Sequence, residues 1–204
     1  MFYRFARALV RFLAKVLFRW EVKGAEHMPQ RGGVILAANH VSLLDPLFVG
    51  STVNRKVHFM AKEELFKIPL LGRVITALGA FPVRRGAADR QAIREALRIL
   101  ETGEVVGIFP EGTRSVDGEL QKAKNGIALL ATRANAPVVP AVISRSKKMT
   151  RGRFHLPRLV KIRVLLGPPI VLTRLDSDRA EKDNLEILSS RIMEAIAELK
   201  SRLG

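Results

Sequence analysis

The chain has 204 residues, which suits one sizeable core and is too short for two comfortable domains. Hydrophobic residues make up 48% of it, which excludes a disordered chain, and the absence of cysteine excludes disulfides and thiolate chemistry. Lys and Arg number 35 against 19 acidic residues, a formal net charge of +16. Such a surface attracts nucleic acid, an anionic membrane face or a phosphorylated substrate.

The first 20 residues have the pattern of a basic amphipathic helix. Aromatic and aliphatic residues alternate with cations spaced three or four positions apart, at Arg4, Arg7, Arg11, Lys15 and Arg19. The cations are too frequent for a transmembrane span, and they run through the apolar stretch instead of preceding it as in a signal peptide. The pattern favours a helix lying in a bilayer interface. The alternative is a helix packed on its own domain with a solvated basic stripe.

Strand-like and helix-like segments alternate along the rest of the chain. Strands are expected within residues 20–24, 32–39, 56–62, 80–85, 104–110, 137–143 and 158–167. Helices are expected from 46 to 50, in two pieces within 63–79, and over 89–100, 125–135 and 185–203. This alternation predicts one α/β domain over residues 21–204, with a largely parallel or mixed central sheet flanked by helices. Residues 1–20 are expected to form a separate N-terminal amphipathic membrane-binding helix. Catalytic groups are expected on loops beyond the strand ends.

An imidazole and a carboxylate follow the expected strand 32–39. His40 and Asp45 are five positions apart, so they point in different directions on a regular helix. Pro46 changes this, because the residue before a proline leaves the helical region and proline is favoured as the first helical residue. We therefore expect Asp45 to be the N-cap of a helix that starts at Pro46. Residues 39–45 then form a loop that brings the carboxylate to one imidazole nitrogen.

This pairing suits general base catalysis on a substrate alcohol. A carboxylate on one nitrogen fixes the tautomer of His40 and leaves the other nitrogen free to take a proton from a hydroxyl. There is no cysteine, and Ser42 does not lie in a G-x-S-x-G setting, so no enzyme nucleophile is evident. The spacing alone also fits a simpler arrangement, in which Asp45 only caps its helix and His40 is an ordinary loop histidine.

The segment GIFPEGTRS, residues 107–115, also follows a buried apolar strand. Arg114 suits bidentate binding of a phosphate, with the hydroxyl of Thr113 beside it. Glu111 either binds a substrate hydroxyl or holds Arg114, and a polar turn with a local ion pair is the alternative. Arg84 and Arg85 end another extended segment. The four histidines show no metal-ligand spacing, and no glycine-rich nucleotide-binding fingerprint is present.

Together these segments resemble the glycerolipid acyltransferase family. Asn39 and His40 followed by Asp45 match its N-H-x-x-x-x-D motif, and FPVR at residues 81–84 matches its F-x-x-R block. FPEGTRS at residues 109–115 matches the third block in full, and VVPAVI matches the fourth, apolar block. The four blocks occur in family order and cover roughly residues 33–143.

The resemblance implies transfer of a fatty acyl group from acyl-CoA or acyl carrier protein to lysophosphatidic acid, giving phosphatidic acid. It makes His40 the general base and Asp45 the residue that orients it. Its implied substrate-binding residues are Asn39, Ser42, Arg84, Arg85, Glu111, Gly112, Thr113 and Arg114. The second block often reads F-I-D-R, and Pro82-Val83 replaces its middle pair here. This leaves the phosphate contact open between Arg84 and Arg85, and another lysolipid acceptor remains an alternative.

The implied reaction needs no cofactor and no metal. Its lipid substrates reside in a bilayer, so the expected partner is an anionic phospholipid membrane. The expected location is peripheral and monotopic, on the cytoplasmic face of the cell membrane. The rival interpretation is a non-enzymatic basic protein that binds lipid or nucleic acid. No nucleic-acid partner is expected, because the chain has one Trp and one Tyr, too few for aromatic stacking platforms.

Overall fold

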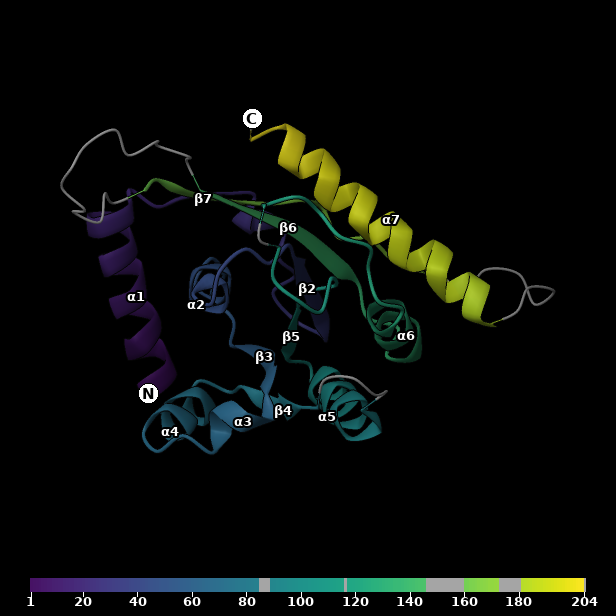
Figure 1. Ribbon diagram of the computed structural model, residues 1–204, viewed down its shortest axis with the longest axis horizontal. Coiled ribbons are helices and arrows are strands. Elements are labelled where there is room, and N and C mark those ends of the chain that lie inside the picture. Colours follow the sequence, from purple (N-terminus) through teal and green to yellow (C-terminus); the bar gives the residue numbers. More distant parts are fainter. Residues whose placement is uncertain (85–88, 116, 146–159, 173–180, 204) are drawn as a thin grey trace.

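The computed structural model describes residues 1–84, 89–115, 117–145, 160–172 and 181–203. A sheet of seven strands has the order β1-β7-β6-β2-β5-β3-β4 (Figure 1). The strands are β1 Glu21–Lys23, β2 Val34–Ala38, β3 Val57–Lys62, β4 Phe81–Val83, β5 Val105–Ile108, β6 Val138–Arg145 and β7 Ile162–Leu166. Neighbouring strands are parallel except β6 and β7, which are antiparallel. The predicted α/β fold with a mixed sheet is therefore confirmed.

Helices cover both faces of this sheet. They are α1 Phe2–Phe18, α2 Asp45–Gly50, α3 Glu63–Phe66, α4 Leu71–Ala77, α5 Arg90–Glu101, α6 Gly126–Arg133 and α7 Glu181–Ser201. A short 3-10 helix, η1 Ala25–His27, was not expected. The predicted break within residues 63–79 is confirmed, since α3 and α4 are separate helices. No helix in the described part of the chain is long and apolar enough to cross a membrane.

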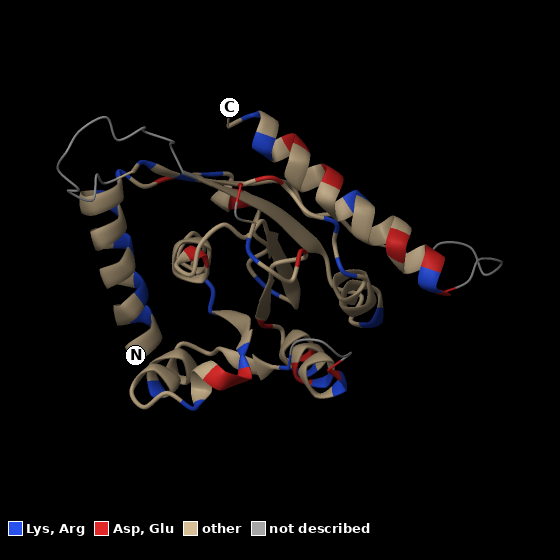
Figure 2. Cartoon of the chain, in the orientation of Figure 1, with Lys and Arg blue, Asp and Glu red and all other residues tan. Residues whose placement is uncertain are grey.

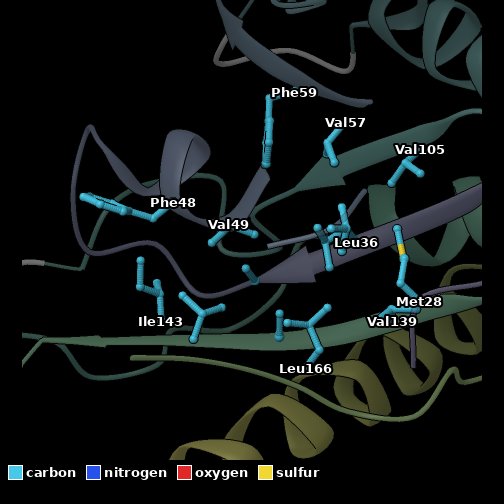
Figure 3. Close-up of a cluster of buried hydrophobic side chains, with 14 of the residues drawn as sticks. Met28, Leu36, Phe48, Val49, Val57, Phe59, Val105, Val139, Ile143 and Leu166 are labelled. Atoms are coloured by element: carbon cyan, nitrogen blue, oxygen red, sulfur yellow. The ribbon is translucent and has the colours of Figure 1, made fainter. Parts of the chain in front are cut away.

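The central strand β2 separates two hydrophobic clusters. All five of its residues are buried, as expected for a parallel strand covered on both faces. Leu36 points into a cluster with Phe48 of α2 and Phe59 of β3 (Figure 3). Ile35 points to the opposite face, into a cluster with residues of α5, α6 and α7. Burial on both sides fixes the end of β2, and the loop that follows starts from this rigid point.

Helix α1 packs against the α2 region through a face that carries both arginines and apolar residues. Nε of Arg11 donates to the carbonyl of Ser51 at 2.7 Å, and its Nη2 donates to the carbonyl of Val53 at 3.0 Å. Nη1 of Arg7 donates to the same Val53 carbonyl at 3.3 Å. The ring of Phe18 meets that of Phe48 edge to face, with centroids 5.4 Å apart. The guanidinium groups thus satisfy carbonyls at and just beyond the C-terminus of α2.

The sequence left open whether the cations of this helix meet a membrane or are solvated, and two of them do neither. The cations of α1, blue in Figure 2, differ in their surroundings. Arg7 and Arg11 are turned toward the domain, whereas Arg4, Lys15 and Arg19 are exposed. Helical spacing places side chains on a common stripe, but it does not say which neighbour that stripe meets.

Replacing Arg11 with alanine is expected to lower the free energy of unfolding by about 1.5–3 kcal/mol, the usual value for hydrogen bonds to a charged group. The carbonyls of Ser51 and Val53 would lose their donors. Urea denaturation followed by circular dichroism measures this change. Arg4→Ala is the matched control, because Arg4 is exposed on the same helix. Equal stability of the two variants would show that the contacts of Arg11 contribute nothing.

Candidate active site

The loop after β2 is tied to the neighbouring strand β6 by one side chain. Nδ2 of Asn39 donates to the carbonyl of Ile143 at 3.1 Å, and Oδ1 accepts from the Ile143 N–H at 2.8 Å. Asn39 is 3% exposed. Both ends of its amide are therefore engaged by backbone, and this pair of bonds fixes the chain immediately before His40.

The loop folds back and joins His40 to Asp45, as the sequence predicted. Nδ1 of His40 lies 2.9 Å from Oδ2 of Asp45, whose side chain is fully buried. The same oxygen accepts the backbone N–H of Val41 at 2.7 Å and that of Ser42 at 2.6 Å. An oxygen that accepts two N–H groups is the unprotonated acceptor in its contact with the imidazole. Nδ1 of His40 therefore carries the proton and donates it to this oxygen. Nε2 of the neutral ring then has the free lone pair.

The expected helix start is wrong by one residue. Helix α2 begins at Asp45, its N-cap position is Leu44, and no side chain caps it. Asp45 instead turns its carboxylate back to the loop, where the N–H groups of Val41 and Ser42 use the oxygen that a cap would offer. The hydroxyl of Ser42 accepts from the N–H of Leu44 at 3.3 Å, so Ser42 also stabilises this turn.

The segment after β5 holds the backbone of His40 on both sides. The N–H of His40 donates to Oε1 of Glu111 at 3.1 Å, and its carbonyl accepts from the N–H of Ser115 at 2.8 Å. The imidazole stacks on the ring of Phe109, with centroids 4.0 Å apart and planes at 15°. Phe109 in turn stacks on Phe59. The two motif segments therefore form one unit around His40.

Glu111 connects this unit to a third stretch of chain. Its Oε2 accepts from the backbone N–H of Gln121 at 3.1 Å, and the residue is 3% exposed. Burial raises the pKa of Glu111, and the N–H groups of His40 and Gln121 partly offset this rise. Within the described residues no ion pair joins Glu111 to Arg114. These contacts indicate that Glu111 holds the His40 loop and the chain at Gln121 together.

A cavity of about 310 Å³ starts at His40, which is within the usual range for ligand pockets. Much of its wall is apolar, formed by Leu43, Met60, Leu65, Ile93, Ile108, Ile127 and Leu130. Three cations also line it, namely Lys62, Arg84 and Lys124. An apolar chamber with cations and a histidine suits a ligand that combines a hydrocarbon chain with an anionic group.

The structure brings some of the predicted substrate-binding residues to this cavity and leaves others outside its lining. Arg84 and Gly112 line it, and Nε of Arg84 donates to Oε2 of Glu63 at 2.8 Å. Thr113 and Arg114 are exposed and do not belong to the lining residues. Arg85 lies outside the described residues.

Sequence reasoning missed two of the lining cations. Lys62 ends strand β3, and its place at a parallel strand end was a usable signal. Lys124 lies in a segment with no motif that the sequence reasoning used, and tertiary folding alone brings it to the cavity. Among the residues that the structure describes, no cluster of His, Asp and Glu is arranged to hold a metal ion.

The raised pKa of Glu111 gives a pH-dependent prediction. The folded protein holds the proton of the Glu111 carboxyl group more tightly than the unfolded chain does. The contribution of protonated Glu111 to stability is therefore greatest at low pH. It is lost as the pH rises from about 4, the usual carboxyl value, through the raised pKa. The free energy of unfolding of the wild type, relative to Glu111→Gln, should therefore fall across this window.

Urea denaturation at a series of pH values measures that difference. Glu101→Gln, which changes an exposed carboxylate, is the control. A difference between wild type and Glu111→Gln that stays flat or grows with pH would contradict the role of burial.

Comparisons with known proteins match the part of the chain that contains the His40 loop and the 107–115 segment. A family model described as Acyltransferase matches residues 19–144. The 1-acyl-sn-glycerol-3-phosphate acyltransferase of Bacillus subtilis is 27% identical over 202 residues, covering 98% of each chain. The protein of the same name from Borreliella burgdorferi is 26% identical over 182 residues, covering 88% of this chain and 72% of its own.

A solved structure agrees with the fold as well. The crystal structure of the 1-acyl-sn-glycerophosphate (LPA) acyltransferase PlsC from Thermotoga maritima superimposes with a TM-score of 0.71 at 28% identity. The match covers 97% of this chain and 79% of that one. The family match spans β1, the whole His40 loop, the 107–115 segment and nearly all of β6, and on this evidence the chain belongs to the acyltransferase family.

Proposed function

We propose that the protein is a 1-acyl-sn-glycerol-3-phosphate O-acyltransferase. It moves a fatty acyl group from acyl-CoA or acyl carrier protein to the free hydroxyl of lysophosphatidic acid and forms phosphatidic acid. The names of the relatives and of the similar solved structure support this acceptor. The observation that carries the proposal is the His40–Asp45 pair at the wall of a largely apolar cavity.

The reaction follows from the orientation of the imidazole. Nε2 of His40 accepts the proton of the acceptor hydroxyl while the hydroxyl oxygen attacks the thioester carbonyl. The buried carboxylate of Asp45 stabilises the imidazolium that forms. The tetrahedral intermediate collapses, the carbon–sulfur bond breaks, and the thiol leaves with the proton from His40. The acyl group passes directly between substrates, because no enzyme nucleophile takes part.

The cavity wall suits the two halves of such an acceptor. Its aliphatic residues match a hydrocarbon chain, and the guanidinium of Arg84 is one of the lining cations that suit a phosphate. Arg84 is exposed and paired with Glu63, so an incoming phosphate competes with that carboxylate. Another lysolipid acceptor would use the same dyad. A purely binding function gives no reason for a buried carboxylate that orients a histidine toward a cavity.

Replacing His40 with alanine should reduce turnover at least about 100-fold, the low end for the loss of a general base. Mass spectrometry detects the product after the purified protein is mixed with acyl-CoA or acyl carrier protein donors and a panel of lysolipids. The wild type should form phosphatidic acid. His27→Ala is the matched control, because His27 contacts the carbonyl of Leu166 and does not line the cavity.

Two results would overturn this proposal. The first is the absence of acylated product from the wild type with every donor and acceptor, which would favour the non-enzymatic interpretation. The second is near-normal turnover by a folded His40→Ala protein, which would remove His40 from the mechanism.

We infer that residues 1–20 bind a membrane surface next to the acyltransferase domain of residues 21–204. The side of α1 turned away from α2 exposes large apolar residues: Phe2, Phe5, Leu9, Phe12, Leu13, Val16 and Leu17. Leu43, which lines the cavity, is 69% exposed. This arrangement supports a monotopic association in which the apolar side of α1 enters the interface and the exposed cations meet anionic headgroups. The cytoplasmic face, where acyl donors are made, is the proposed location.

The double variant Phe5→Ser with Phe12→Ser should bind vesicles containing anionic phospholipid at least about tenfold more weakly. Full burial of one such side chain contributes about 1.5–3 kcal/mol. Cosedimentation with vesicles measures the affinity. Val171→Ser is the control, because Val171 is 64% exposed but lies outside α1. Undiminished binding by the double variant would place the membrane contact elsewhere, with the exposed residues of α3 and α4 as the next candidates.

A further inference from the structure

The three cations of the cavity differ in their pairing. Nζ of Lys62 lies 3.0 Å from Oε1 of Glu64, and Nε of Arg84 lies 2.8 Å from Oε2 of Glu63. Lys124 has no acidic partner among the residues that the structure describes. Its ammonium group is therefore the cavity cation whose charge the described part of the protein leaves uncompensated.

Lys124 is bonded to the segment that supports His40. Its backbone N–H donates to the carbonyl of Pro110 at 2.9 Å. Its side chain lies over Gly112, where a Cβ would come within 2.8 Å of the lysine Cε and 3.2 Å of Nζ. Gly112 also has a φ of 70°, so both the backbone and the lysine favour glycine there. The missing side chain makes room for Lys124 beside the catalytic loop.

The carboxylate next to this site does not neutralise the lysine. Glu111 precedes Gly112, but its two oxygens accept the backbone N–H groups of His40 and Gln121. An ammonium group near the catalytic histidine, with three N–H donors and no acidic partner in the described structure, is suited to an anionic group of the substrate.

We propose that Lys124 binds the phosphate of the acyl acceptor; this rests on the proposed lysophosphatidic acid acyltransferase function. In that acceptor the phosphate is attached to the carbon next to the one that bears the reacting hydroxyl, so it enters the site together with the hydroxyl. The phosphates of CoA are separated from the thioester by the whole pantetheine arm. A cation that lies against the segment holding His40 therefore suits the acceptor phosphate, and Lys124 makes the enzyme specific for phosphorylated acceptors.

Binding without turnover tests this assignment. Wild type, Lys124→Ala and Lys122→Ala are titrated calorimetrically, with no donor present, with a short-chain 1-acylglycerol 3-phosphate and with the 1-acylglycerol of the same chain length. Lys122 is the matched control, since it lies two positions away, pairs with Glu186 and does not line the cavity. A third titration uses acyl-CoA.

Lys124→Ala should weaken binding of the phosphorylated ligand roughly 10- to 100-fold, as expected for the loss of a charge-assisted contact. Binding of the phosphate-free ligand and of acyl-CoA should be unchanged, and Lys122→Ala should behave as wild type. Unchanged affinity for the phosphorylated ligand overturns the proposal, and so does an equal loss in Lys122→Ala. Weakened binding of acyl-CoA alone would assign Lys124 to a donor phosphate instead. A different result would show that the proposed function itself is wrong. In that case the wild type would bind these ligands but form no phosphatidic acid.

Discussion

The bond between Nδ1 of His40 and the carboxylate of Asp45 is the interaction on which the rest of the site depends. A buried carboxylate is stable only when it receives hydrogen bonds, and the N–H groups of Val41 and Ser42 both donate to Oδ2 of Asp45. The loop must therefore fold back tightly. Asn39 fixes its start to β6, and α2 fixes its end. Strands β2 and β6 thus hold the reacting nitrogen in place from the centre of the sheet.

The charge of the protein is divided between structural and functional uses. Arg7 and Arg11 satisfy backbone carbonyls beyond α2, and this contact turns the apolar side of α1 outward. The cations at the cavity are placed differently, beside aliphatic walls and near the dyad. A net charge of +16 indicates attraction to anions in general, whereas the position of each cation decides which anion it meets.

Most of the fold was predictable because the central strands β2 and β5 are continuous apolar runs and a helix such as α5 has clear periodicity. The His40–Asp45 contact was predictable because Pro46 indicates a helix start, which leaves the residues before it for a loop. The premise that Asp45 itself leaves the helical region was wrong, since α2 begins at Asp45. The helix start was missed because the loop, and not the helix, uses the carboxylate of Asp45. The inward direction of Arg11 and the placement of Lys124 over Gly112 were not predictable, since both depend on segments that meet only after folding.

The tautomer of His40 tests the central claim most directly. The account predicts that the neutral imidazole carries its proton on Nδ1, donated to Asp45, and leaves Nε2 free to act as a base. Long-range proton–nitrogen correlation spectra of protein labelled with 15N-histidine identify the protonated nitrogen, and loss of one set of signals in His40→Gln assigns it. A protonated Nδ1 and a bare Nε2 support the account. A neutral ring with its proton on Nε2 would contradict it, because that nitrogen could not then accept the proton of the acceptor hydroxyl.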